Sequence, residues 1–300
     1  MTHFAWKIFA ALSVFLLLPL CVAGQSRRTR IAIVGFNGDG ISAAVADALA
    51  SIFSSKERAA PAAEFETSDR NLAITAARGA GYSGQLNMSV QEARDIGASI
   101  GCDFYFLGNA QTLRRTSSAR AIYYETSASI FLVSARTGRL ILWDGPTAED
   151  DSAEQSESKF MRMLSSARYG YVVAVRRAVE DEREERASAV QNGTPVIELL
   201  ANDQQNSDVQ VQAPRPYRRL KPPYPDAAAR AEIEATVDAL VEIDAQGEVR
   251  SVQIERWAGY GLDDSVVATV KQMHFFPARR DGIPISLRVL LRYNFRKPPS

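Results

Sequence analysis

The sequence is poor in cysteine and histidine and has no excess of either charge. Its 300 residues include two cysteines and two histidines, and 35 basic side chains balance 35 acidic ones. A balanced charge creates no global field for nucleic acid, so no nucleic-acid partner is expected. His3 and His274 lie far apart and match neither a Ser-His-Asp arrangement nor a metal-binding motif. The sequence therefore predicts no catalytic residue, no cofactor and no metal site.

The sequence also has no apolar run of the length that a membrane span needs. Residues 8–22 form the longest run, of about 15 residues, whereas a spanning helix needs about 20. A positive charge at Lys7 precedes the run, and the small residues Ala23 and Gly24 follow it, as is typical of a signal peptide. Residues 1–24 are thus predicted to export the chain to the periplasm. An uncleaved inner-membrane anchor made by residues 8–22 is the alternative.

Cysteine chemistry is correspondingly limited. Cys21 lies in the leader, and Leu20 stands before it where lipid attachment needs a small residue. Removal of the leader would leave Cys102 as a single thiol, which excludes an intramolecular disulfide. Cys102 lies in an apolar stretch that enters a strand, so we expect a small core residue rather than a reactive thiol.

Strands and helices alternate between residues 29 and 182. Residues 30–36 are continuously apolar, which favours a strand buried on both faces. Ser89 and Glu92 have the spacing of a capping box that opens a helix at residues 90–100, and Gly101 ends it. Further strands are expected at 103–110, 119–134 and 140–143, and further helices at 42–53, 72–78 and 158–185. This alternation predicts an α/β sandwich.

Glycines follow the first strand at Gly35, Gly38 and Gly40. Such a turn can cradle a phosphate at a helix N-terminus, but the glycine order is not the dinucleotide motif and no Lys-Ser or Lys-Thr follows. A nucleotide-responsive module is the weakest of three functional hypotheses.

The same stretch resembles a group of envelope proteins. Its motifs are the run at 31–36, the capped helix that ends Ile-Gly-Ala-Ser-Ile-Gly-Cys-Asp, the strand Phe-Tyr-Phe-Leu-Gly, and the hairpin Val-Ser-Ala-Arg-Thr-Gly-Arg-Leu-Ile-Leu-Trp. Together they are similar to the CsgG/LpoB/TolB-N-terminal group over residues 30–180. The resemblance implies an interaction or assembly module in the periplasm or at the outer membrane, not an enzyme.

Residues 183–215 become rich in Gln, Asn, Asp and Ser and are predicted to be a linker. A flexible coil of about 30 residues spans roughly 30 Å on average and about 100 Å when stretched.

Residues 216–300 are predicted to form a second, small α+β domain. A short helix at 226–231 precedes strands at 233–244 and 249–256, a helix at 263–273 and a last strand at 287–295. In the first strand the even positions 236–244 are expected to be wet and the odd positions buried. Val266, Val267 and Val270 are expected to point inward from the helix. The chain as a whole is then α+β, with β-β-α-β order in this domain.

This part resembles the TonB C-terminal domain family over residues 216–297. The shared motifs are Tyr224-Pro225, the Ile-Asp-x-x-Gly turn at 243–247, Gly-Leu-Asp at 261–263, Phe-Phe-Pro-Ala at 275–278, Asp-Gly-Ile-Pro at 281–284 and Tyr-Asn-Phe at 293–295. In that family the domain binds an extended peptide of an outer-membrane transporter by adding it to the sheet edge. The resemblance implies partner-binding residues at the domain entrance and the last strand, namely Tyr224, Pro225, Val289, Leu291, Tyr293 and Phe295.

Three departures from the family's sequence pattern limit which of the family's functions we expect for this chain. Pro223 stands where the family often has Gln, the corner Trp257-Ala258-Gly259 replaces a polar one, and a proline-rich spacer is missing. We therefore expect a non-enzymatic envelope protein that binds extended peptides of outer-membrane or periplasmic partners. The alternative is an energy transducer that works with inner-membrane motor proteins and couples the proton-motive force to nutrient transport across the outer membrane. A homodimer through the C-terminal domain is left open.

Overall fold

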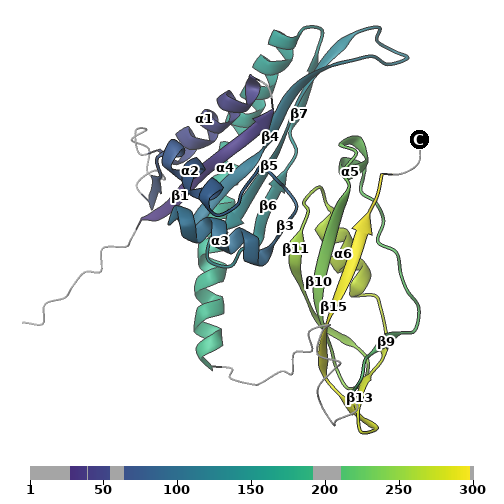
Figure 1. The fold of residues 1–300 in the computed structure, drawn as a ribbon. Coiled ribbons are helices and arrows are strands. Elements are labelled where there is room, and N and C mark those ends of the chain that lie inside the picture. Colours follow the sequence, from purple (N-terminus) through teal and green to yellow (C-terminus); the bar gives the residue numbers. More distant parts are fainter. Residues whose placement is uncertain (1–27, 39, 55–63, 192–210, 298–300) are drawn as a thin grey trace, which may run out of the picture.

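The computed structural model describes residues 28–38, 40–54, 64–191 and 211–297. The predicted leader, including Cys21, and most of the predicted linker, residues 192–210, lie outside the described residues. Two sheets, each with its own helices, lie side by side, and the fold is of the α+β class (Figure 1). Among the described residues no helix is long and apolar enough to cross a membrane.

The N-terminal sheet has the strand order β2-β1-β4-β5-β6. The edge of β5 that pairs with β6 at residues 130–133 pairs with β7 at residues 124–127. β1 runs parallel to β2 and β4, and β4, β5 and β6 are antiparallel neighbours. The strands are β1 (Thr29–Gly38), β2 (Phe65–Thr67), β4 (Phe104–Arg115), β5 (Tyr123–Ser134), β6 (Leu140–Asp144) and β7 (Thr147–Asp150). β2 and β7 were not predicted, because three or four residues are too few to show a period.

Helices cover both faces of this sheet. Ile31 and Ile33 of β1 face α1 (Ile41–Phe53) and α4 (Ala153–Gln191), while Ala32 and Val34 belong to the core on the side of α2 (Arg70–Gly79) and α3 (Val90–Ile100). The prediction of a strand buried on both faces is confirmed, because alternate residues of an apolar run fill opposite cores.

The predicted capping box opens α3. The Ser89 hydroxyl accepts the N–H of Glu92 at 3.1 Å, and a Glu92 carboxylate oxygen accepts the N–H of Ser89 at 2.7 Å. This backbone hydrogen bond lowers the pKa of Glu92 below its usual value. Gly101 ends the helix in the left-handed region, at φ 72°. These features are local, so the sequence predicts them well.

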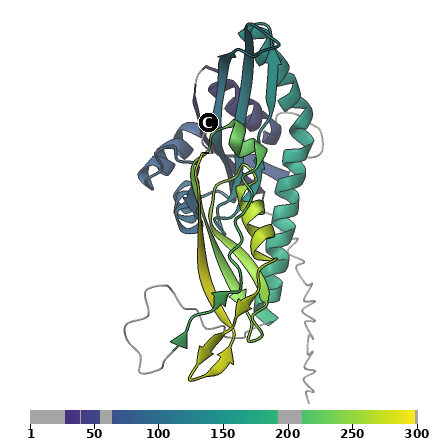
Figure 2. The same ribbon diagram turned by 90° about the vertical axis from the view of Figure 1, so that its right-hand side faces the viewer.

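α4 is longer than predicted. It begins at Ala153 and runs past residue 185 to Gln191, into the stretch assigned to the linker, and it extends beyond the sheet (Figures 1 and 2). Glu182 accepts from Arg136 at 2.6 Å, and Glu185 accepts from Arg139 at 2.5 Å. These ion pairs bind the far end of α4 to the turn between β5 and β6. The sequence did not predict this contact, because Glu185 lies in the stretch assigned to the linker.

The C-terminal sheet has the order β15-β10-β11-β3. Its main strands are β10 (Ala235–Ile243), β11 (Val249–Trp257) and β15 (Leu287–Phe295), and β3 (Met88–Ser89) comes from the N-terminal domain. The helices are α5 (Asp226–Arg230) and α6 (Leu262–Val270). Two small sheets lie at the far end, formed by β9 (Arg215–Pro216) with β12 (Phe275–Phe276), and by β8 (Val211–Gln212), β13 (Ala278–Arg280) and β14 (Ile283–Ile285).

Two burial predictions for this domain are wrong. Asp238 and Asp244 of the expected wet face are only 5% and 6% exposed, because arginine side chains from neighbouring positions cover them. Val267 is half-buried instead of inward, and Ser265 and Thr269 take inward positions on α6. The Ser265 hydroxyl donates to the backbone carbonyl of Pro223, and the Thr269 hydroxyl donates to the backbone carbonyl of Ser265.

The two domains share one continuous hydrophobic core. Phe131 and Val133 of β5 belong to the same buried cluster as Val237 and Trp257 of the C-terminal sheet. β3 pairs antiparallel with the end of β11, Ser89 with Arg256 and Met88 with Trp257. The sequence predicted two domains joined by a linker and gave no sign of this contact.

Candidate functional site

β15 forms the open edge of the C-terminal sheet. All nine of its residues pair with β10, from Leu287 opposite Ile243 to Phe295 opposite Ala235. Within the described part of the chain, no strand pairs with its other side. A long edge of this kind presents unpaired N–H and C=O groups to a further strand.

The side chains of β15 alternate between two environments. The predicted partner-binding residues Val289, Leu291 and Tyr293 are half-buried and pack on the domain's own core, and Phe295 is buried. The opposite face carries residues that the sequence reasoning did not select: Arg288, Leu290, Arg292 and Asn294. The strand's period of two could have shown them, although it does not tell which face is covered.

Ion pairs fix most of this opposite face. Arg292 forms two hydrogen bonds to Asp238, at 2.7 and 2.9 Å, and Arg256 lies 3.8 Å from the same carboxylate. The Asp238 carboxylate raises the pKa of Arg292. Arg288 bonds to Glu242 at 3.2 Å. Both arginines of this face are thus engaged by acidic residues of β10.

Tyr224 and Pro225 lie at one end of β15. The Tyr224 ring is 6.2 Å from the Phe295 ring, and its hydroxyl donates to the carbonyl of Ile233 at 2.5 Å. Burial raises the pKa of Tyr224 above its usual value. Pro225 precedes α5 and packs against Gly261. A Cβ added to Gly261 would lie 3.5 Å from the Pro225 ring. The structure thus brings together Tyr224 and Phe295, two of the predicted partner-binding residues, and their role in binding stays a prediction.

The opposite edge of the same sheet is partly closed. Beside β3, the Asn87 amide nitrogen donates to the carbonyls of Thr236 and Trp257 at 2.8 and 2.7 Å, and its oxygen accepts the N–H of Thr236 at 3.1 Å. The Trp257 indole N–H donates to the carbonyl of Gly138 at 3.0 Å. These contacts leave β15 as the sheet's full-length free edge in the described structure.

The comparisons with known proteins identify this domain. Residues 221–296 match the family model described as the Gram-negative bacterial TonB protein C-terminal. They form a TonB C-terminal domain. The chain is 33% identical over 79 residues to Protein TonB of Vibrio cholerae serotype O1, an alignment that covers 26% of this chain and 32% of the relative. The chain thus spans about a third of the length of that curated relative.

Solved structures similar to this chain share low identity with it. The hypothetical protein CT253 from Chlamydia trachomatis is 11% identical, with 49% of this chain and 99% of that one covered and a TM-score of 0.35. The LpoB C-terminal domain from Escherichia coli is 14% identical, with 43% and 88% covered and a TM-score of 0.26. Neither likeness supports a functional statement about the part that precedes the TonB domain.

The corner after β11 seats the TonB domain on the N-terminal sheet. Gly259 has φ 74°, and an added Cβ would lie 2.5 Å from the Phe131 ring and 2.8 Å from the Trp143 ring. The Tyr260 ring lies 5.0 Å from Trp143. Only glycine fits at this position, so the corner that departs from the family pattern is the docking surface of the two domains.

The Asp263 carboxylate stabilises this corner, and its raised pKa predicts that the stability cost of replacing it depends on pH. Its carboxylate accepts the N–H groups of Ala258 at 2.9 Å and Gly259 at 2.7 Å, and burial raises its pKa to about 6. The pKa of an aspartate in the unfolded chain is about 3.9, so the folded chain binds the proton more tightly than the unfolded chain does. Asp263 therefore lowers the free energy of unfolding as the pH rises from about 3.9 to about 6. We expect urea denaturation to show that Asp263→Asn costs about 2 kcal/mol less at about pH 7.5 than at about pH 4.5.

Asp264→Asn is the matched control for this prediction, because the Asp264 side chain is exposed on the same turn. Because the Asp264 charge makes only the smallest contribution to the raised pKa of Asp263, the cost of Asp264→Asn should change between the two pH values much less than that of Asp263→Asn. An Asp263→Asn cost that is constant, or that grows with pH, would contradict a raised pKa at this corner.

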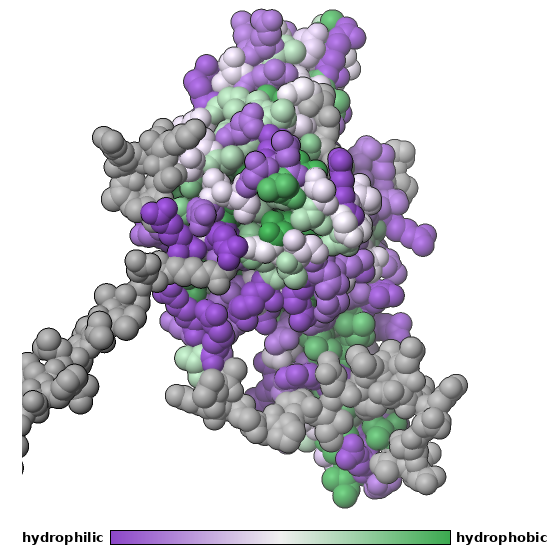
Figure 3. All heavy atoms as spheres, turned by 60° about the vertical axis from the view of Figure 1, so that its left-hand side comes forward, coloured by the Kyte–Doolittle hydropathy of each residue, from purple (hydrophilic) through white to green (hydrophobic). Residues whose placement is uncertain are grey.

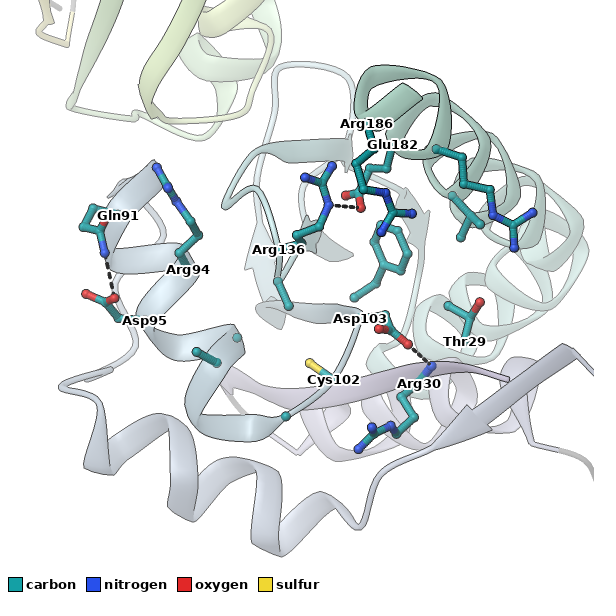
Figure 4. A pocket seen from close by; sticks show the side chains of 17 residues that line it. Thr29, Arg30, Gln91, Arg94, Asp95, Cys102, Asp103, Arg136, Glu182 and Arg186 are labelled. Carbon is teal, nitrogen blue, oxygen red and sulfur yellow. Dashed lines mark hydrogen bonds and ion pairs between the residues drawn. The ribbon is translucent and has the colours of Figure 1, made fainter. Parts of the chain in front are cut away.

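A separate hollow of about 750 Å³ lies in the N-terminal domain, with Cys102 among its lining residues. Arginines surround it, and one of them, Arg136, is paired with Glu182 (Figure 4). Burial raises the pKa of the Cys102 thiol to about 12. A thiol with this pKa holds almost no thiolate near neutrality, which fits the predicted unreactive residue and offers no nucleophile.

This pKa predicts slow alkylation of Cys102. In a full chain carrying Cys21→Ser, the native protein should react with iodoacetamide at about pH 8 about 1000-fold more slowly than the urea-unfolded protein. The reaction is followed by mass spectrometry. A native rate within about tenfold of the unfolded rate would show an accessible thiolate and contradict the assignment.

His274 has an acidic partner in the C-terminal domain. His274 lies 3.0 Å from a Glu248 carboxylate oxygen in an exposed pair. In the described residues no group of three or more His, Cys, Asp or Glu side chains could hold a metal ion. The face in Figure 3 is mainly hydrophilic with scattered apolar patches, which by themselves do not mark a binding site.

Proposed function

We propose that this chain is a non-enzymatic cell-envelope protein whose TonB domain binds an extended peptide of an outer-membrane or periplasmic partner as an added strand on β15. The observation that carries the proposal is the nine-residue open edge of β15, in a sheet whose other edge is partly occupied by β3. An added strand obtains affinity from main-chain hydrogen bonds and selectivity from side-chain contacts.

The surroundings of the edge suit this role. Leu290 is 42% exposed on the outer face, while Tyr224, with Phe295 beside it, lies at one end of the strand. A partner strand would thus meet an apolar contact in its middle and an aromatic pair at its end. Tyr224, Pro225, Val289, Leu291, Tyr293 and Phe295 act in this proposal mainly by shaping and stiffening the edge.

A periplasmic location follows in this proposal from the predicted leader, residues 1–24, together with the TonB domain. The second candidate is an energy transducer anchored by residues 8–22 and partnered with inner-membrane motor proteins; the likeness to a protein named TonB favours it. N-terminal sequencing of the protein isolated from cells distinguishes the two. A chain that starts at Gly24 or Gln25 would remove the transducer.

The binding proposal is tested by photo-crosslinking in cells. A photoreactive amino acid replaces Leu290 in the full chain, and a matched variant carries it at Leu72 of α2, which is 72% exposed. We expect the variant at Leu290 to form an adduct with an outer-membrane transporter or a periplasmic protein, identified by mass spectrometry, and the variant at Leu72 to form none with that partner. No adduct at Leu290, or the same adducts at both positions, would contradict binding at β15.

A further inference from the structure

A groove lies between β6 of the N-terminal sheet and β11 of the C-terminal sheet. It has a volume of about 750 Å³ and is bordered by residues 140–143 of β6 on one side and 251–254 of β11 on the other. The first turn of α6 and the flank at Val267 complete its wall. We call it the interdomain groove.

Two strand edges that are unpaired in the described part of the chain face this groove. Four consecutive residues of each strand line it, and since side chains alternate between sheet faces, the strands meet the groove with their edges. Within residues 28–38, 40–54, 64–191 and 211–297, β6 pairs with β5 alone, and β3 pairs with β11 only at Arg256 and Trp257. Among the described residues, no backbone hydrogen bond joins the free side of either edge to another element.

The side chains along the groove are mostly apolar. Leu140, Leu142, Val252, Ile254 and Val267 are half-buried there, so they retain surface that a ligand could cover. The Trp143 indole N–H is buried and has no hydrogen-bond partner within the described part of the chain. This unsatisfied donor belongs to a residue that lines the groove.

The charges at the groove differ along its border. Arg139 and Glu185 neutralise each other in an ion pair of 2.5 Å. Asp263 and Asp264 lie together at the start of α6, and no ion pair to a basic side chain compensates them among the described contacts. A ligand with a positive charge beside the aspartates would complement this border.

We propose that the interdomain groove binds an extended segment of a partner protein, apolar along its length and basic at one end, which adds as a strand to the edges of β6 and β11. The unpaired backbone edges favour a peptide over a small molecule, since only another backbone matches their repeat of donors and acceptors. This site is distinct from β15, because β10 separates β15 from β11 in the sheet. The chain then holds two peptide sites, and the second exists only because the domains are docked.

Tryptophan fluorescence tests the inference directly. The sequence has three tryptophans, and Trp143 and Trp257 both line the groove, so a full chain carrying Trp6→Phe reports on this site. The probe is a synthetic peptide of about six residues, alternating valine and threonine after an N-terminal lysine, which has the usual length of a strand. We expect a saturable shift of the emission maximum. The same peptide with N-methylated backbone amides should bind at least about tenfold more weakly, because it cannot donate to the edges.

Matched variants locate the binding. Val267→Glu places a charge on the apolar wall and should weaken binding at least about tenfold, whereas Ala268→Glu, exposed on the same helix and outside the groove lining, should leave it unchanged. Absence of a saturable shift at millimolar peptide would overturn the inference. Equal binding of the N-methylated peptide would also overturn it. Loss of binding in Leu290→Glu but not in Val267→Glu would place the peptide on β15, which would reject the groove and support the proposed function.

Discussion

Replacing Trp257 with alanine is expected to lower the free energy of unfolding by about 4 kcal/mol. The side chain is 1% exposed, its ring centroid is 5.7 Å from that of Phe131, and its N–H donates to the carbonyl of Gly138. Removal leaves a cavity between the domains and an unsatisfied carbonyl. Urea denaturation followed by circular dichroism measures the loss.

The same variant should also change the number of transitions. A continuous core predicts that both domains of the native chain unfold together, whereas the loss of Trp257 should separate the transition of the TonB domain from that of the rest. Trp257→Phe keeps a ring but lacks the N–H and should cost about half as much, within one transition. A cost below about 1 kcal/mol for Trp257→Ala would show that the docking is weak.

Replacing Asn87 with aspartate is expected to cost about 3 kcal/mol although the side-chain shape is unchanged. The amide group of Asn87 donates to two carbonyls, those of Thr236 and Trp257, at the point where β10 and β11 diverge. A carboxylate cannot donate and would place negative oxygens beside these carbonyls. The loss is measured by urea denaturation at neutral pH.

Asn71→Asp is the control for this change, because Asn71 is exposed on α2 and should tolerate the same substitution within about 0.5 kcal/mol. Equal costs for the two variants would mean that Asn87 does not join the domains.

Local features of the fold could be predicted from the sequence, and contacts between the domains could not. Ser89 and Glu92 are three residues apart, so the pattern itself contains the capping box. Asn87 and Thr236 are 149 residues apart. A polar residue shortly before a helix, such as Asn87, does not indicate a partner at that sequence distance. The corner Trp257-Ala258-Gly259 was visible as a departure from the family pattern. Its cause, contact with Phe131 and Trp143, required the fold.

The candidate site shows the same limit. The bounds of β15 match the predicted strand at 287–295, because its alternation is regular. The alternation gives two faces without telling which is covered. The charged residues Arg288 and Arg292 suggest a solvent face, yet Glu242 and Asp238 on β10 engage them across a sequence separation of 46 and 54 residues. The binding role of Val289, Leu291, Tyr293 and Phe295 stays a prediction.

Backbone hydrogen exchange tests peptide binding at β15 most directly. The full chain is compared with and without an extended peptide taken from an outer-membrane transporter of the same cells. We expect slower exchange for the β15 amides that point away from β10, and no change at the equivalent positions of β4, which lies inside its own sheet. Unchanged exchange along β15 at saturating peptide, or protection only elsewhere, would contradict strand addition at this edge.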